Sequence, residues 1–183
     1  MDTRRQLINA ATAVMAERGY SGASTKAVAD AAGVTHGLVH YHFGSKLGLL
    51  MAVVTEAHRR TAEEVAAVRD AVGPGAARLA LQAASHRAHQ RPEVFRLRYE
   101  LFAVALREPE VAPAVARLLA EARGGIGTTI EHSQPSPPVA TAELAAIALA
   151  VFDGLALQQL VDPDFDSDAV FAAFGRLTGV VAE

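Results

Sequence analysis

A short stretch of the sequence, from Thr25 to Lys46, is rich in side chains that donate hydrogen bonds or carry positive charge. Lysine neutralises phosphates, hydroxyls donate to phosphate oxygens, and imidazole and phenol rings offer donors and flat surfaces to bases. A glycine among them would let the backbone approach DNA closely. These residue types predict a DNA contact through Thr25, Lys26, Thr35, His36, Gly37, Leu38, His40, Tyr41, His42 and Lys46.

Three short helices with tight joints must position these side chains. Apolar residues recur at three- and four-residue spacing over residues 3–18, which predicts the first helix. The second and third helices are expected to span only about two turns each, which is typical of a helix-turn-helix. Their boundaries follow from capping and stopping residues: Gly19, Ser24 or Thr25, Gly33, Thr35 and Phe43-Gly44.

The turn Ala32-Gly33-Val34 joins the second and third helices. Glycine adopts backbone conformations that residues with side chains resist, and Val34 is expected to fill the core between the two helices. A helix of two turns is unstable alone, so its neighbours must hold the third helix in place. Its exposed N-terminal face could then enter a major groove, which makes double-stranded DNA the predicted partner.

One set of residues recurs here in a recognisable order and spacing: Gly19-Tyr20, Thr25, Val28-Ala29-Asp30-Ala31-Ala32-Gly33-Val34-Thr35, Gly37, Val39, Tyr41-His42-Phe43, Ser45-Lys46 and Leu49-Leu50. The set resembles the DNA-binding domain of the TetR family of transcriptional regulators. The resemblance implies that the third helix reads bases, while Thr25, Thr35 and Lys46 match positions that contact the DNA backbone. His36, Leu38 and His40 differ from the basic, small polar and tyrosine residues that the family often has there.

The rest of the chain also reads as helices. They are expected at about 46–68, 76–90, 92–107, from there toward 131, and at 140–161 and 167–182. Residues 95–101 and 107–110 look like the family branch named for the betaine-responsive repressor, and residues 153–158 are similar to a segment found in many members of the family. These resemblances imply a similar architecture. The sequence therefore predicts an all-α chain, with a helix-turn-helix domain at 1–48 and a helical ligand-binding and dimerisation bundle at 49–183.

The charge distribution agrees with a DNA-binding N-terminal segment followed by an acidic remainder of the chain. Residues 1–50 hold five basic and three acidic residues, a net +2, whereas the remainder holds 12 basic and 17 acidic residues, a net −5. No cysteine is present, which excludes disulfides and thiolate metal sites. No signal peptide is apparent, and Glu143 and Asp153 interrupt the most apolar segment, so we expect a soluble cytoplasmic protein without a membrane partner.

The last two expected helices hold more apolar residues than one buried stripe needs. A compact intramolecular core could absorb them, but a two-fold four-helix interface explains them better. Symmetric DNA half-sites also require a dimer, so a homodimer is predicted. The apolar residues are Leu144, Ile147, Leu149, Val151, Phe152, Leu155, Leu160, Val170, Phe171, Phe174, Leu177 and Val181.

A small-molecule effector site is expected in the bundle, where bulky apolar side chains occur beside isolated polar groups. A mostly apolar molecule would suit them, although Arg98 could equally pair with a carboxylate. Plain core packing is at least as good an interpretation for each phenylalanine. The candidates are His86, His89, Phe95, Arg98, Tyr99, Phe102, Phe152 and Gln158.

Catalysis, metal binding and cofactors are not expected. His86 and His89 could share a helix face as metal ligands, but a half-exposed polar face is the better interpretation. Residues 124–127 lack the strand and the Lys-Ser/Thr of a phosphate loop.

Taken together, the predicted DNA-binding domain, dimer and effector site predict a repressor that binds a pseudo-palindromic operator and releases it on binding a small molecule. A helical adaptor without DNA binding and a helical enzyme with its site in the bundle are the alternatives.

Overall fold

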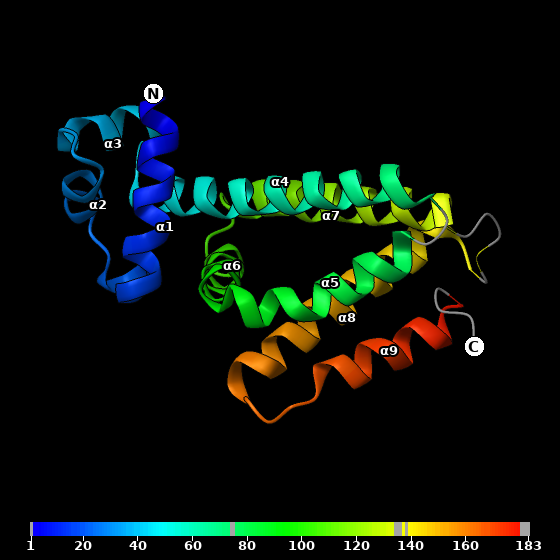
Figure 1. Cartoon of the computed structure of the whole chain (residues 1–183). Helices are drawn as coiled ribbons and strands as arrows, with labels where there is room; N and C mark the ends of the chain where they lie inside the picture. The colour runs from blue at the N-terminus through cyan, green and yellow to red at the C-terminus, as the bar shows by residue number, and fades with distance from the viewer. Residues whose placement is uncertain (1, 74–75, 134–136, 138, 180–183) are drawn as a thin grey trace. The chain divides into compact units, whose positions relative to one another are not determined.

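The computed structural model describes residues 2–73, 76–133, 137 and 139–179. These residues form nine helices and no strand, which confirms the predicted all-α class (Figure 1). The helices are α1 (Thr3–Gly22), α2 (Thr25–Ala32), α3 (His36–Phe43), α4 (Lys46–Val72), α5 (Ala76–Gln90), α6 (Pro92–Ala105), α7 (Ala112–Ser133), α8 (Thr141–Val161) and α9 (Ser167–Leu177).

The chain divides into two compact units. The first combines Met1–Arg59 with Glu93–Val115, and the second combines Arg60–Pro92 with Ala116–Glu183. In the first unit α1 packs against α2 and α2 against α3, which together we call the three-helix head (blue in Figure 1). Its apolar residues lie inward at helical spacing, as amphipathic helices require. The buried residues are Leu7, Ile8, Ala11, Val14, Met15, Ala23, Val28, Ala29, Ala32 and Val39.

The head's boundaries follow the capping and stopping residues closely. Gly19 takes a φ of 69°, which interrupts α1 before a last short turn to Gly22. The Ser24 hydroxyl accepts a hydrogen bond from the Ala27 N–H at 3.0 Å and so caps α2. The expected cap at Thr35 is wrong in one respect: Thr35 has the N-cap position of α3, but its side chain makes no capping hydrogen bond.

Later helices end at different residues from those expected. α4 continues to Val72, where Gly73 with a φ of 67° leaves the helical conformation. α6 ends at Ala105, because the Arg107 and Glu108 N–H groups both turn back to the Val104 carbonyl. α9 ends at Leu177, where Gly179 takes a φ of 71°. Residues 180–182 of the expected last helix lie outside the described part of the chain.

In the second unit α5 packs against α8 and α9, and α8 also contacts α9. Leu155 of α8 and Phe171 of α9 form one apolar cluster, with Phe152 packed against it. A second cluster joins Ile130 of α7 to Leu144 and Ala145 of α8. Contacts within the chain therefore bury part of the apolar surface that was predicted for α8 and α9.

Helix α8 is long and apolar enough, by length and composition alone, to cross a membrane. Its window has a mean hydropathy of 1.8 and is 33% buried inside the chain. A core helix of a water-soluble protein passes the same test, so a single helix of this kind is weak evidence for a membrane span.

Candidate nucleic-acid interface

The turn between α2 and α3 has the geometry of a tight helix-turn-helix joint. Gly33 lies in the left-handed region, at φ 66° and ψ 32°, and its N–H is bonded to the Ala29 and Asp30 carbonyls. The Val34 N–H also bonds the Ala29 carbonyl, at 3.0 Å. This double return closes α2 after eight residues and lets α3 begin at once. The glycine is needed because an L side chain at this φ is strained.

Helix α3 is held from one side and exposed on the other. Val39 is fully buried against its neighbours, whereas Tyr41 is 81% exposed. Glycine at position 48 brings the start of α4 close to the end of α3, because a Cβ there would collide with the Phe43 carbonyl oxygen. Leu38 and His42 are half-buried, and the exposed residues on or just before α3 are Thr35, His36, Gly37, His40 and Tyr41.

Two histidines occupy the exposed side of α3 one helical turn apart. The His36 Nε2 lies 2.8 Å from the Thr25 hydroxyl at the start of α2. The His40 Nδ1 lies 3.2 Å from the Gly44 carbonyl oxygen. The two rings meet edge to face, with centroids 4.9 Å apart. The structure thus groups Thr25, His36 and His40 into one polar surface.

The two lysines differ in their surroundings. Lys26 is exposed on α2. The Lys46 amine instead donates to the Ser21 carbonyl at 3.0 Å and lies 4.6 Å from the centre of the Tyr20 ring. Lys46 therefore links the start of α4 to the end of α1, a structural contact that sequence reasoning missed. The pKa of Tyr20 is raised, first by burial and then by the negative charges of Glu108 and Glu100.

A cation near α3 was also missed. The Arg4 guanidinium lies 5.5 Å from the centre of the Phe43 ring, so the N-terminal end of α1 brings positive charge to the end of α3. The half-buried Phe43 ring provides the platform for this contact. The cationic Arg4-Arg5 pair in the sequence was the available signal.

The candidate effector residues fall into two groups, one in each compact unit. On α6, Arg98 lies over the Phe102 ring at 5.2 Å, and Tyr99 meets the same ring edge to face at 6.3 Å. Phe95 is 7% exposed, which favours core packing for it. These residues belong to the first unit.

The remaining effector candidates belong to the second unit. Phe152 is half-buried and packs on Phe171 with ring centroids 6.3 Å apart. The Gln158 amide, which is exposed, donates to the Gly154 carbonyl of its own helix at 3.3 Å. His86 is exposed, and the side chain of His89 lies outside the described part of the chain.

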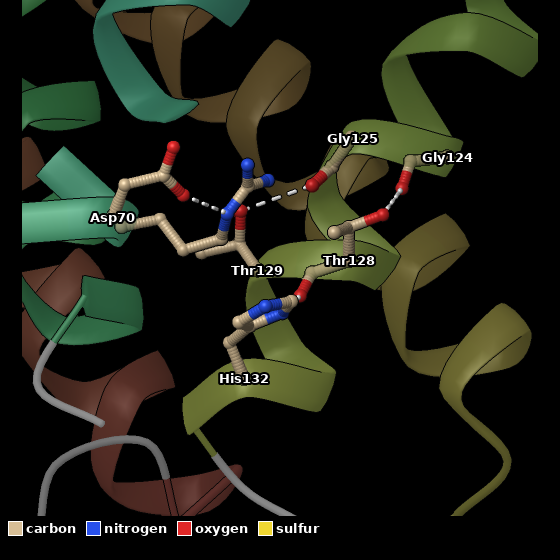
Figure 2. Close-up of polar contacts among 7 residues, drawn as sticks. Asp70, Gly124, Gly125, Thr128, Thr129 and His132 are labelled. Carbon is tan, nitrogen blue, oxygen red and sulfur yellow. Dashed lines mark hydrogen bonds and ion pairs between the residues drawn. The ribbon is translucent and has the colours of Figure 1, made fainter. Parts of the chain in front are cut away.

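Polar groups that the sequence analysis did not single out lie along α7. Thr128 and Thr129 donate to the Gly124 and Gly125 carbonyls at 3.1 and 3.0 Å, and His132 bonds the Thr128 carbonyl at 2.8 Å (Figure 2). These bonds stay within one helix, so they satisfy the side chains locally. Asp70 of α4 is drawn beside them and accepts a bond from Arg69 Nε at 3.1 Å.

A largely buried cation also lies in the second unit. The Arg87 side chain is 19% exposed, and its Nε lies 3.8 Å from a carboxylate oxygen of Glu64. Burial lowers the pKa of Arg87, Glu64 opposes that change, and Arg91 adds to it. Among the described residues no group of three or more His, Cys, Asp or Glu side chains is placed to hold a metal ion.

Two family models match the chain. Residues 7–53 match the model described as bacterial regulatory proteins, tetR family. Residues 73–180 match the model described as tetracyclin repressor-like, C-terminal domain. Together the two models span the head and most of the remaining helices.

Individual relatives are regulators as well. The transcriptional regulator BetI of Rhizobium meliloti is 28% identical over 158 residues, which are 85% of this chain and 77% of BetI. The transcriptional repressor AcnR of Corynebacterium efficiens is 34% identical over 65 residues, 36% of this chain, and the match spans only 35% of AcnR. The solved multidrug binding protein EbrR, complexed with proflavin, is 26% identical with a TM-score of 0.65, over 96% of this chain and 99% of EbrR.

Proposed function

The chain belongs to the tetR family of bacterial regulatory proteins, and on that premise we propose that it is a ligand-responsive repressor that binds a pseudo-palindromic operator as a homodimer. The family and the relatives are transcriptional regulators and not enzymes. DNA binding is implied by the family. The operator, the dimer and the release of DNA by an effector are the proposal.

One observation carries the DNA-binding proposal: α3 is a two-turn helix whose buried Val39 anchors it while its other side is exposed and polar. An exposed helix fixed by two companions is the part that a helix-turn-helix places in a major groove. We assign base contacts to His36, Gly37, Leu38, His40 and Tyr41, with His42 beside them. We assign phosphate contacts to Thr25, Lys26, Thr35 and Lys46, with residues 1–48 as the DNA-binding domain.

The homodimer is supported by an unpartnered apolar stripe on α8. Ile147, Leu157 and Val161 are 49%, 47% and 77% exposed in the single chain, and they recur at helical spacing. Ala150 and Gly154 lie in the same stripe, and nothing approaches within 4 Å of a Cβ built on Gly154. Small residues flanked by larger apolar ones allow two helices to pack closely. We propose that the stripe meets the same stripe of a second copy.

The effector is proposed to bind within residues 49–183 and to shift the dimer toward a state with a different spacing of its two heads. EbrR, which is similar over nearly the whole chain, is complexed with proflavin. Helix α4 contributes residues to both compact units, so it is the natural connection between effector and DNA. Such coupling is typically worth about 1–3 kcal/mol, or roughly 5- to 150-fold in affinity. A cytoplasmic location follows from this proposal.

Fluorescence anisotropy over a salt series tests the proposal. The probe is a duplex selected by the full-length protein from a randomised pool. Affinity should fall steeply with salt, since each phosphate contact releases a counterion, and should exceed the affinity for a scrambled duplex. Failure to select any duplex, with a correctly folded protein, would reject DNA binding and favour a helical adaptor.

A further inference from the structure

Helix α3 has an unusual charge composition for a DNA-binding helix. Among the helices that the structure describes, it alone contains no Lys, Arg, Asp or Glu, but it contains His36, His40 and His42. Histidine is the side chain whose charge ordinarily changes near pH 6.5. The charge that α3 presents to DNA is therefore set by the protonation of its imidazoles.

The hydrogen bond of His40 fixes which of its two ring nitrogens carries the hydrogen in the neutral ring. Its Nδ1 lies 3.2 Å from the Gly44 carbonyl oxygen, which can only accept, so Nδ1 carries the hydrogen. In the neutral ring, Nε2 is then an acceptor and repels the lone pairs of a phosphate or guanine oxygen. In the protonated ring, the same Nε2–H becomes a charged donor.

His36 behaves in a complementary way through Thr25. Its Nε2 lies 2.8 Å from the Thr25 hydroxyl, which can donate to a neutral ring or accept from a protonated one. Once His36 is protonated, the Thr25 hydroxyl oxygen must accept from Nε2–H, and the hydroxyl's own O–H becomes free to donate a hydrogen bond to a phosphate. Toward DNA, the protonated Thr25–His36 pair therefore offers hydrogen-bond donors.

The charges around this pair leave the imidazoles without a carboxylate partner among the described residues. Lys26 and Asp30 lie on α2, Arg4 on α1 and Lys46 at the start of α4, and the described polar partners of the two histidines are the Thr25 hydroxyl and the Gly44 carbonyl oxygen. The His36 and His40 rings lie 4.9 Å apart, so two positive charges there repel each other. An anion placed against the exposed side of α3 would relieve that repulsion.

We propose that DNA binding by this chain takes up a proton at the His36–His40 pair, and that the protonated His40 donates its Nε2–H to an acceptor of the duplex. The proposal rests on the proposed DNA-binding function. The proton comes from solvent when the complex forms and returns to solvent when it dissociates. Affinity therefore rises as pH falls through the range in which histidine titrates.

The test measures anisotropy of the selected duplex with the full-length protein at about pH 6 and about pH 8 and constant ionic strength. One linked proton changes affinity by up to about tenfold per pH unit, which allows at most about 100-fold over these two units. An ordinary histidine is already mostly protonated at pH 6 before DNA binds, so binding should be about tenfold tighter at pH 6 than at pH 8. His40→Gln should remove most of this ratio. His40→Lys, which carries a permanent charge, should bind at pH 8 nearly as well as at pH 6.

Two controls keep the result specific. His132→Gln removes an exposed histidine of α7 and should keep the ratio of the unsubstituted protein. Circular dichroism at both pH values verifies that every variant is folded. An equal pH ratio in the unsubstituted protein and in the His36→Gln/His40→Gln double variant would overturn the proposal. Absence of DNA binding at both pH values would instead reject the proposed function itself.

Discussion

The three-helix head and the α8–α9 pair differ in how far their apolar side chains are buried within the single chain. The head buries Leu7, Val28 and Val39 completely, and what it exposes on α3 is mainly polar or aromatic. The α8–α9 pair leaves Val161 and Leu177 77% and 84% exposed. The head therefore buries its apolar side chains within one chain and exposes a polar surface that suits DNA. Helices α8 and α9 leave apolar side chains exposed in the single chain, which suits an interface with a second copy.

The largest expected effect comes from a charge in the α8 stripe. Ile147→Glu should weaken the dimer by about 3 kcal/mol or more, because an unpaired carboxylate would be buried between the two copies. Sedimentation should show monomers, and affinity for DNA should fall with dimerisation. Phe152→Glu serves as the comparison variant. It places a charge against the Leu155–Phe171 cluster and should therefore unfold the second unit instead of only separating the dimer. Intact Ile147→Glu dimers would contradict the assigned interface.

The next effect concerns the turn of the head. Gly33→Val should destabilise the head by roughly 2 kcal/mol, because a β-branched residue is strained at a φ of 66°. DNA binding should be lost, and thermal melting followed by circular dichroism measures the stability change. Gly37→Ala, at a helical position with open space, should instead raise the melting temperature. Identical melting and binding by the Gly33→Val variant would disprove the role of the turn.

A smaller effect should separate the two lysines. Lys26→Ala and Lys46→Ala should each weaken all DNA sequences alike by roughly 1–2 kcal/mol, since a phosphate contact carries no sequence information. Only Lys46→Ala should also lower the melting temperature, because its amine holds Ser21 and lies over Tyr20. A loss confined to one base position would show that the lysine reads a base.

The smallest effect is a pH dependence of stability. The pKa of Tyr20 is raised above 10.0, so the neutral phenol favours the folded state. This contribution is complete below about pH 10 and is lost as pH rises through the folded pKa. Urea unfolding at rising alkaline pH should therefore show a shallower loss for Tyr20→Phe than for the unsubstituted protein. Tyr41→Phe, which removes an exposed phenol, is the matched control.

The fold of the head could be predicted because its signals are local. Gly19, Gly33 and Gly44 were expected to stop helices, and all three have positive φ values. Thr35 was expected to cap α3 with its side chain, but its hydroxyl makes no such bond. Sequence reasoning places the cap residue and cannot fix its rotamer.

Contacts between distant segments could not be predicted. Lys46 reaches Ser21, 25 residues earlier, and Gly48 is required by the Phe43 carbonyl; no repeated pattern announces either contact. In the bundle, apolar periodicity does not distinguish a residue that lines a ligand site from one that packs in a core. Phe95 and Phe152 illustrate this: both are effector candidates, yet Phe95 is buried and Phe152 is half-buried against the Leu155–Phe171 cluster.

Dimethyl sulfate protection of the selected duplex tests the central claim most directly, because the reagent methylates guanine N7 in the major groove and adenine N3 in the minor groove. Two copies of α3 in successive major grooves should protect two clusters of guanines about 34–36 Å apart, related by two-fold symmetry. The Gly33→Val variant should protect neither cluster. Protection confined to the minor groove, or unchanged by Gly33→Val, would contradict the account.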